Sequence, residues 1–170
     1  MNSFSHEVWE KLRLQLIPFF GSGLQVFIPE SWSDLYENWF KEIEAGSFRE
    51  SLRYNTEEIK TRLTGKNVLI LFMVVNERPE VVILGYSAKR ERGDIFYLDT
   101  FAVRTKGKGI GRIVLSSIIQ WAKLNGYYAI ELDTEAENEE GVPLQRFYER
   151  FGFVVQCIED DGNITMSLSL

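Results

Sequence analysis

A glycine-rich segment between an apolar strand and an amphipathic helix is the feature that most constrains how this chain can fold. Residues 95–103 predict a strand, because apolar, aromatic and β-branched side chains dominate them. The glycine-rich segment 106–111 follows and opens a helix over 110–124, where apolar side chains recur on one face. Residues 129–133 then predict a second strand. A strand, a long helix and another strand form a crossover unit, so the two strands should be parallel.

The other predicted elements complete a mixed sheet with helices on it. Strands at 68–75 and 81–88 are joined to each other and to 95–103 by short turns, which implies antiparallel pairing. The remaining strands are predicted at 24–28, 153–159 and 164–168, the last two as a hairpin. The remaining helices are predicted at 33–45, 56–63, 143–150 and, with a strand as the alternative, 5–16. The sequence therefore predicts one α/β domain (α+β type) over 1–170, with a mostly antiparallel sheet of about six to seven strands.

Capping signals set the boundaries of the two helices in the first half of the chain. Asn55 and Glu58 have the spacing of a capping box at the start of the helix at 56–63. The helix at 33–45 is expected to bury the face that carries Leu35 and Ile43. Gly46 is expected to end that helix, because glycine is common at helix C-termini.

Composition restricts the classes of partner and compartment. The net charge of −6 argues against a nucleic-acid-binding protein, because such proteins usually carry a basic balance. The single cysteine, Cys157, cannot form an internal disulfide, which suits a reducing cytoplasm. Its place in a predicted strand without a nearby histidine predicts a buried structural thiol. With one cysteine and one histidine, no metal site is expected. No apolar run reaches the roughly 20 residues of a membrane span, so we expect a cytoplasmic protein. We expect it to be a monomer or a homodimer.

The glycine-rich loop has the chemistry of a pyrophosphate site. A helix N-terminus offers unpaired N–H groups and partial positive charge, and glycines let an anion approach the backbone closely. Lys106, Lys108 and Arg112 add positive charge. The P-loop pattern needs Ser or Thr after Gly-Lys, and the dinucleotide pattern Gly-x-Gly-x-x-Gly fails at Arg112 or Val114. The alternatives are a turn that only lets the helix leave the strand, and a nucleotide site of another α/β enzyme.

Three segments in this order resemble the GNAT superfamily of N-acetyltransferases. They are Tyr97-Leu98-Asp99-Thr100-Phe101-Ala102-Val103, the loop 106–111, and Phe147-Tyr148-Glu149-Arg150-Phe151-Gly152-Phe153. The family's loop pattern is Arg/Gln-x-x-Gly-x-Gly/Ala. Lys106 takes its first position if Gly111 closes the pattern, and Arg104 takes it in the alternative alignment. We prefer Lys106, because Gly111 then lies next to the helix. Many members carry an asparagine seven residues before the tyrosine, where this chain has Gly141.

The resemblance implies acetyl-CoA as the co-substrate and assigns roles in binding it. The backbone of Phe101, Ala102 and Val103 would bind the pantetheine arm like an added strand. The loop residues that would hold the pyrophosphate are Lys106, Gly107, Lys108, Gly109, Ile110, Gly111 and Arg112. The thioester would lie where the strands that end near Val103 and Asp133 splay apart. Residues 66–170 would form the acetyl-CoA-binding core, and residues 1–65 the substrate side.

The implied reaction is acetyl transfer to a primary amine by direct attack. Tyr148 matches the family's general acid, and the alternative is a packed aromatic residue. Asp99 is the candidate base, directly or through a water, and the alternative is a surface carboxylate or a salt bridge. A competing function is a non-catalytic acyl-CoA sensor or interaction domain with the same fold.

The acceptor is expected to be a small-molecule or peptide amine, with some preference for a cationic one. The observation behind this preference is a run of acidic residues, which are Glu131, Asp133, Glu135, Glu137, Glu139 and Glu140. A solvated edge is the simpler interpretation of this run. A rim that attracts a cationic amine is the other.

Overall fold

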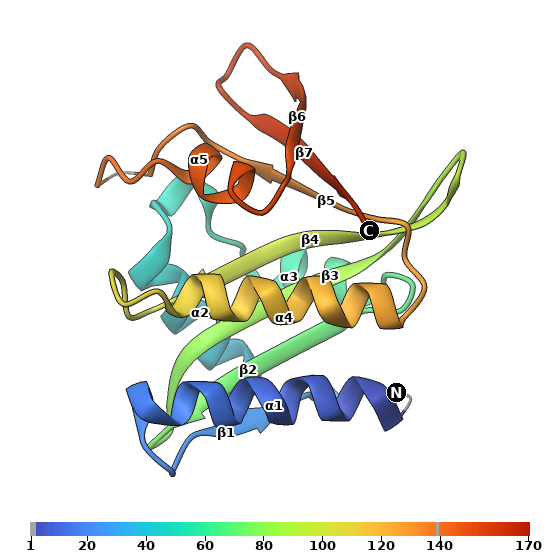
Figure 1. Ribbon diagram of the computed structural model, residues 1–170. Helices are drawn as coiled ribbons and strands as arrows, with labels where there is room; N and C mark the ends of the chain where they lie inside the picture. Colours follow the sequence, from blue (N-terminus) through green and yellow to red (C-terminus); the bar gives the residue numbers. More distant parts are fainter. Residues whose placement is uncertain (1–2, 139) are drawn as a thin grey trace.

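The computed structural model describes residues 3–138 and 140–170, and it forms a seven-stranded sheet flanked by helices (Figure 1). The strands are β1 (Gln25–Phe27), β2 (Leu69–Val75), β3 (Arg78–Arg90), β4 (Gly93–Val103), β5 (Ala129–Thr134), β6 (Val154–Ile158) and β7 (Ile164–Ser169). The helices are α1 (Ser3–Phe20), α2 (Asp34–Ser47), α3 (Thr56–Leu63), α4 (Ile110–Leu124) and α5 (Leu144–Glu149), with a 3-10 turn η1 (Glu50–Leu52). The strand order is β1-β2-β3-β4-β5-β7-β6, and the mixed, mostly antiparallel sheet is confirmed.

Helices cover both faces of the sheet. Helices α1 and α4 lie side by side on one face, and α2 and α3 lie on the other (Figure 1). The unbroken apolar run of β2 follows from this arrangement, because successive side chains of a strand point to opposite faces. Leu71 belongs to the core under α1 and α4, whereas Phe72 belongs to the core under α2 and α3.

The crossover from β4 through α4 to β5 is parallel, as predicted. The two strands are paired only at Phe96 with Ile130 and Tyr97 with Glu131. Beyond Tyr97, β4 continues to Val103 without β5 beside it in the ladder, while its other edge stays paired with β3. The two strands therefore separate after Tyr97, as the family resemblance implies.

The N-terminal segment is a helix, so the alternative strand at 5–16 is wrong. Leu12 and Leu16 are buried in the core, whereas Leu14 is exposed on the opposite side of α1. A second correction concerns α2, which passes through Gly46 and ends at Ser47. Leu35 of that helix is exposed, because the buried face carries Trp39, Phe40, Ile43 and Glu44.

Cys157 is exposed, which corrects the prediction of a buried thiol. It lies on β6, the edge strand of the sheet, which pairs only with β7 in the described sheet. Val154 and Ile158 on the same strand are also exposed.

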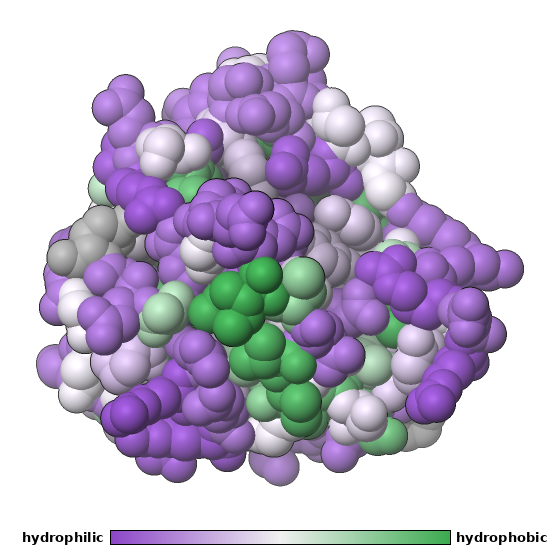
Figure 2. Space-filling model, turned by 90° about the horizontal axis from the view of Figure 1, so that it is seen from above, coloured by the Kyte–Doolittle hydropathy of each residue, from purple (hydrophilic) through white to green (hydrophobic). Residues whose placement is uncertain are grey.

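The face seen from above in Figure 2 is mostly hydrophilic and includes an apolar patch. In the part of the chain that the structure describes, no helix is long and apolar enough to cross a bilayer.

Candidate active site

A cavity of about 590 Å³ opens where β4 and β5 separate. One side of it is formed by residues 97–102 of β4 and residues 132–134 of β5. The opposite side is formed by residues of α2, η1 and α3, and Tyr148 of α5 also lines it. The segment before residue 66 therefore faces the same cavity as the predicted cofactor-binding strands.

The start of α4 is prepared for an anion. Its N-cap is Gly109, with φ of 77°, so no side chain caps the helix and no acidic residue lies in its first turn. The first N–H groups to bond within the helix are those of Arg112 and Ile113, to the Gly109 carbonyl oxygen. The earlier N–H groups of a helix point outwards and can bind a ligand. A pyrophosphate fits this geometry and the positive end of the helix dipole.

Arg104 and Lys106 have different surroundings. The Arg104 guanidinium donates to the Pro79 carbonyl oxygen at 2.8 Å and to Glu42 at 2.7 Å, so it is held by neighbouring elements. Lys106 instead lines the cavity. This difference favours the alignment of the family pattern that begins at Lys106.

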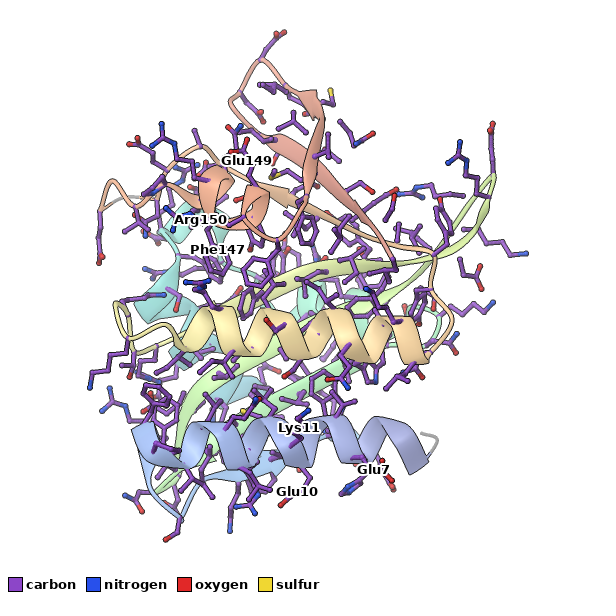
Figure 3. The ribbon with its side chains drawn as sticks, in the orientation of Figure 1. Glu7, Glu10, Lys11, Phe147, Glu149 and Arg150 are labelled. Atoms are coloured by element: carbon purple, nitrogen blue, oxygen red, sulfur yellow. The ribbon has the colours of Figure 1, made fainter. Side chains whose placement is uncertain are left out.

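Helix α5 packs against the start of α4 through Phe147. Figure 3 shows Phe147 pointing from α5 towards α4, and its ring would lie 3.6 Å from a Cβ atom placed on Gly111. That separation is an ordinary van der Waals contact, so this position has room for a methyl group. Helix α5 therefore lies close to the start of α4, but a glycine is not sterically required at position 111.

Tyr148 lines the cavity next to this packing site. Its ring packs edge-on against Phe147 and Phe153, with ring centroids 5.1 and 5.5 Å away. Its hydroxyl has no hydrogen-bond partner among the residues that the structure describes. Burial raises the pKa of Tyr148, so the phenol stays protonated at neutral pH. A neutral hydroxyl without a partner can donate a hydrogen bond to a ligand atom in the cavity.

Asp99 also lines the cavity, and it forms an ion pair. Its two carboxylate oxygens lie 3.1 and 3.2 Å from Nε of Arg62, and Tyr86 and Thr100 donate at 3.3 and 3.2 Å. Arg62 in turn lies over the ring of Tyr54, 3.6 Å from its centroid. The salt bridge that the sequence left as an alternative is therefore present, on a carboxylate that faces the cavity.

Glu44 is a cavity carboxylate that the sequence did not single out. The residue is 1% exposed, and its two oxygens accept the backbone N–H of Tyr54 at 3.3 Å each. Burial raises the pKa of Glu44 to about 7. A signal existed in the sequence, because an acidic residue four positions after Phe40 continues the apolar face of α2.

Asp133 stands at the end of β5, on the opposite side of the cavity. The hydroxyls of Tyr97 and Thr165 each donate to it at 2.6 Å, from β4 and β7. Burial and the hydrogen bond that Tyr97 donates to Asp133 raise the pKa of Tyr97. Glu135, two residues further on, forms an ion pair with Arg49.

The acidic run therefore divides between the cavity and the surface. Asp133 and Glu135 line the cavity, whereas Glu131 pairs with Arg90 at 2.6 Å. Glu139 lies outside the described residues. Within 3–138 and 140–170, no group of three or more His, Cys, Asp or Glu side chains could hold a metal ion.

Comparisons with known proteins identify the family. The model of the acetyltransferase (GNAT) family matches residues 30–153. A search of curated proteins found no significant match. A GNAT acetyltransferase from Elizabethkingia anophelis, solved with acetyl-CoA bound, has a TM-score of 0.61 at 15% identity, covering 88% of this chain and 99% of that one.

Two further solved structures share the fold. The ribosomal-protein-S18-alanine N-acetyltransferase from Escherichia coli has a TM-score of 0.63 at 18% identity, over 86% of this chain and 93% of its own. An aminoglycoside 6'-acetyltransferase of type Ii has a TM-score of 0.65 at 14% identity, over 85% and 96%. Together with the family model, which spans most of the chain, these findings show that the protein belongs to the GNAT family of acetyltransferases.

Proposed function

We propose that this protein transfers the acetyl group of acetyl-CoA to a primary amine. The observation that carries the proposal is one cavity lined by the Tyr148 hydroxyl, which has no partner among the described residues, by Lys106 of the loop that opens α4, and by several carboxylates. The first two features suit the co-substrate, and the carboxylates suit a cationic acceptor.

The chain offers two kinds of backbone contact to acetyl-CoA. Because β5 leaves β4 after Tyr97, the edge of β4 at Phe101 to Val103 faces the splay, and amides of the pantetheine arm can pair with it. The pyrophosphate would bind the loop from Lys106 and the first turn of α4 as far as Arg112. When bound there, acetyl-CoA supplies the thioester that the acceptor attacks.

The transfer needs two proton movements. The acceptor nitrogen loses one proton before it attacks, forms a C–N bond to the acetyl carbon as the C–S bond breaks, and then loses a second proton. Tyr148 is proposed to hydrogen-bond the departing sulfur and to supply its proton. A cavity carboxylate removes the proton of the ammonium, because an alkylamine with a pKa of about 10.4 is mostly protonated at neutral pH. Asp99 is the residue that the sequence indicates for this step.

The acceptor is proposed to be a cationic amine, either a small molecule or a peptide N-terminus. The names of the two solved acetyltransferases above show that this fold serves both an aminoglycoside and an alanine of a ribosomal protein. Asp133 supports a cationic acceptor, because it lines the cavity and accepts hydrogen bonds from neutral hydroxyls rather than from a cation. We also propose a cytoplasmic location, since the exposed thiol of Cys157 suits a reducing compartment.

The test is release of free thiol from acetyl-CoA with a panel of amines. Tyr148→Phe should lower the rate about 100-fold and leave coenzyme A binding unchanged, because only the hydroxyl that faces the sulfur is lost. Tyr127→Phe is the matched control: its hydroxyl bonds to Ser87 at 2.7 Å, and neither residue lines the cavity. If the wild type binds coenzyme A tightly but releases no thiol from acetyl-CoA with any amine, the sensor function is favoured instead.

A further inference from the structure

Glu44 differs from Asp99 and Glu135, two other carboxylates of the cavity, in what surrounds it. Asp99 is paired with Arg62, and Glu135 is paired with Arg49. Among the described residues, no Lys, Arg or His nitrogen lies within 4.0 Å of the Glu44 carboxylate. Its only donor in that part of the chain is the N–H of Tyr54, shared between both oxygens.

This arrangement leaves a buried carboxylate with unused acceptor capacity. An ionised carboxylate can accept about four hydrogen bonds, and burying one without a partner costs free energy. The fold accepts this cost on a side chain that lines the cavity. A cationic or proton-donating group of the acceptor would supply the missing partner.

The surroundings of Glu44 tune its protonation. Burial raises its pKa to about 7 and is the largest influence. The Tyr54 N–H, the Arg53 and Arg62 guanidinium groups lower that pKa, and the Asp99 carboxylate raises it. A carboxylate in this range exchanges a proton readily at neutral pH, which is the property of an effective general base.

We propose that Glu44 is the group that takes the proton from the acceptor amine, directly or through a water. The inference rests on the proposed function and names a different residue for the step that the sequence attributes to Asp99. Glu44 accepts a proton from the R–NH₃⁺ group and becomes a neutral carboxylic acid, and the free amine then attacks the acetyl carbon. Of the two protons that the nitrogen loses, one ends on the thiol product and Glu44 returns the other to solvent.

The ion pair of Asp99 is the reason for preferring Glu44. A proton added to Asp99 would break its charge interaction with Arg62 and leave that half-buried guanidinium without an anionic partner. A proton added to Glu44 breaks no ion pair and removes a buried charge. Asp99 and Arg62, which both line the cavity, then act as positioning residues.

The experiment measures kcat/KM for one amine from about pH 5 to about pH 9. At neutral pH, Glu44→Gln should lower kcat/KM about 100-fold, because general base catalysis typically contributes at least this factor. Binding of coenzyme A, measured by thermal shift, should not change. The ratio of the wild-type kcat/KM to that of Glu44→Gln should rise with pH and level off above about 7. The ionisation of the amine affects both values equally and therefore cancels from this ratio.

Three other variants make the result decisive. Glu42→Gln removes a half-exposed carboxylate from the same helix, outside the cavity, and should leave kcat/KM unchanged. Glu44→Asp keeps a carboxylate and should retain the pH dependence at a lower rate, which preserves the test if the Gln variant folds poorly. Asp99→Asn keeps Glu44, so if Glu44 is the base, kcat/KM of this variant should still rise with pH as the wild-type value does.

Two results would overturn the inference while the proposed function stands. One is a kcat/KM of Glu44→Gln that stays within about threefold of the wild-type value at every pH. The other is a loss that is the same at every pH, since that indicates a structural role. If the wild type binds coenzyme A and acetylates no amine, the proposed function fails, and the inference fails with it.

Discussion

Replacing Gly111 by Asp should separate the stability of the fold from its affinity for coenzyme A. Gly111 lies in the first turn of α4, which has no acidic residue and no side-chain cap. A carboxylate near a helix N-terminus typically stabilises a helix by about 0.3–1 kcal/mol. Without ligand, the Tm of Gly111→Asp should therefore rise by about 1–3 °C in a chain of this size.

The same carboxylate should repel the pyrophosphate. At about 6 Å and an effective dielectric constant of about 20, two unit charges repel by about 3 kcal/mol, which is about 100-fold in Kd. Coenzyme A at about 100 times its wild-type Kd stabilises the wild type by about 2.7 kcal/mol, or about 5–10 °C in Tm. In Gly111→Asp, the same concentration should raise the Tm by about 1 °C.

Gly111→Ala is the control for size. A Cβ atom at this position would lie 3.6 Å from the Phe147 ring, so the methyl group should be accommodated and binding retained. Gly109→Asp is a poorer probe, because φ at Gly109 is 77° and any side chain there strains the backbone. Thermal shift and calorimetric titration with coenzyme A measure all of these values. Equal affinity in the Asp and Ala variants would refute a pyrophosphate site at the start of α4.

Two further predictions concern stability. Gly85→Ala should lower the free energy of unfolding by about 1–3 kcal/mol, because its Cβ atom would lie 2.6 Å from the Tyr97 carbonyl oxygen. Gly46→Ala is the control: its Cβ atom would have nothing within 4 Å, so the change should be neutral or stabilising. Denaturant melts measure both. Glu44→Gln should gain stability relative to the wild type as pH rises, by about 3 kcal/mol between about pH 4 and about pH 8, measured by urea unfolding. The sign follows from the raised pKa of Glu44: its contribution is full below about 4.5 and is lost as pH rises through about 7. A pH-independent difference would contradict this.

Local signals predicted the elements where the deciding contacts are themselves local. The capping box of Asn55 and Glu58 is present, and α3 has the predicted bounds. Helix α4 also has the predicted bounds, because Gly109 precedes it and Asn125 caps its end. Gly46 failed as a stop signal because a glycine does not end a helix by itself. Its neighbours keep helical geometry through the bond from the Phe48 N–H to the Glu44 carbonyl oxygen.

The elements proposed to bind acetyl-CoA could be predicted for the same reason. The glycine-rich loop, the start of α4 and the edge of β4 are each made of consecutive residues, so a sequence motif indicates them. The acceptor half is made of contacts between distant residues. Arg62 and Asp99 are 37 positions apart, and nothing in either segment predicts that they meet. The exposure of Cys157 likewise depends on the position of β6 at the edge of the sheet.

If Glu44 is the base, Asp99 would couple the charge of the acceptor to proton transfer in this cavity. Its pairing with Arg62 connects α3 to β4, and its charge also raises the pKa of Glu44 on α2. A cationic acceptor that binds near Asp99 would offset that charge and make Glu44 a weaker base, whereas a neutral amine would leave it unchanged. The pKa of the base would then depend on which acceptor is bound. Acetylation rates across an amine panel should then follow the charge of the acceptor as well as its fit to the cavity.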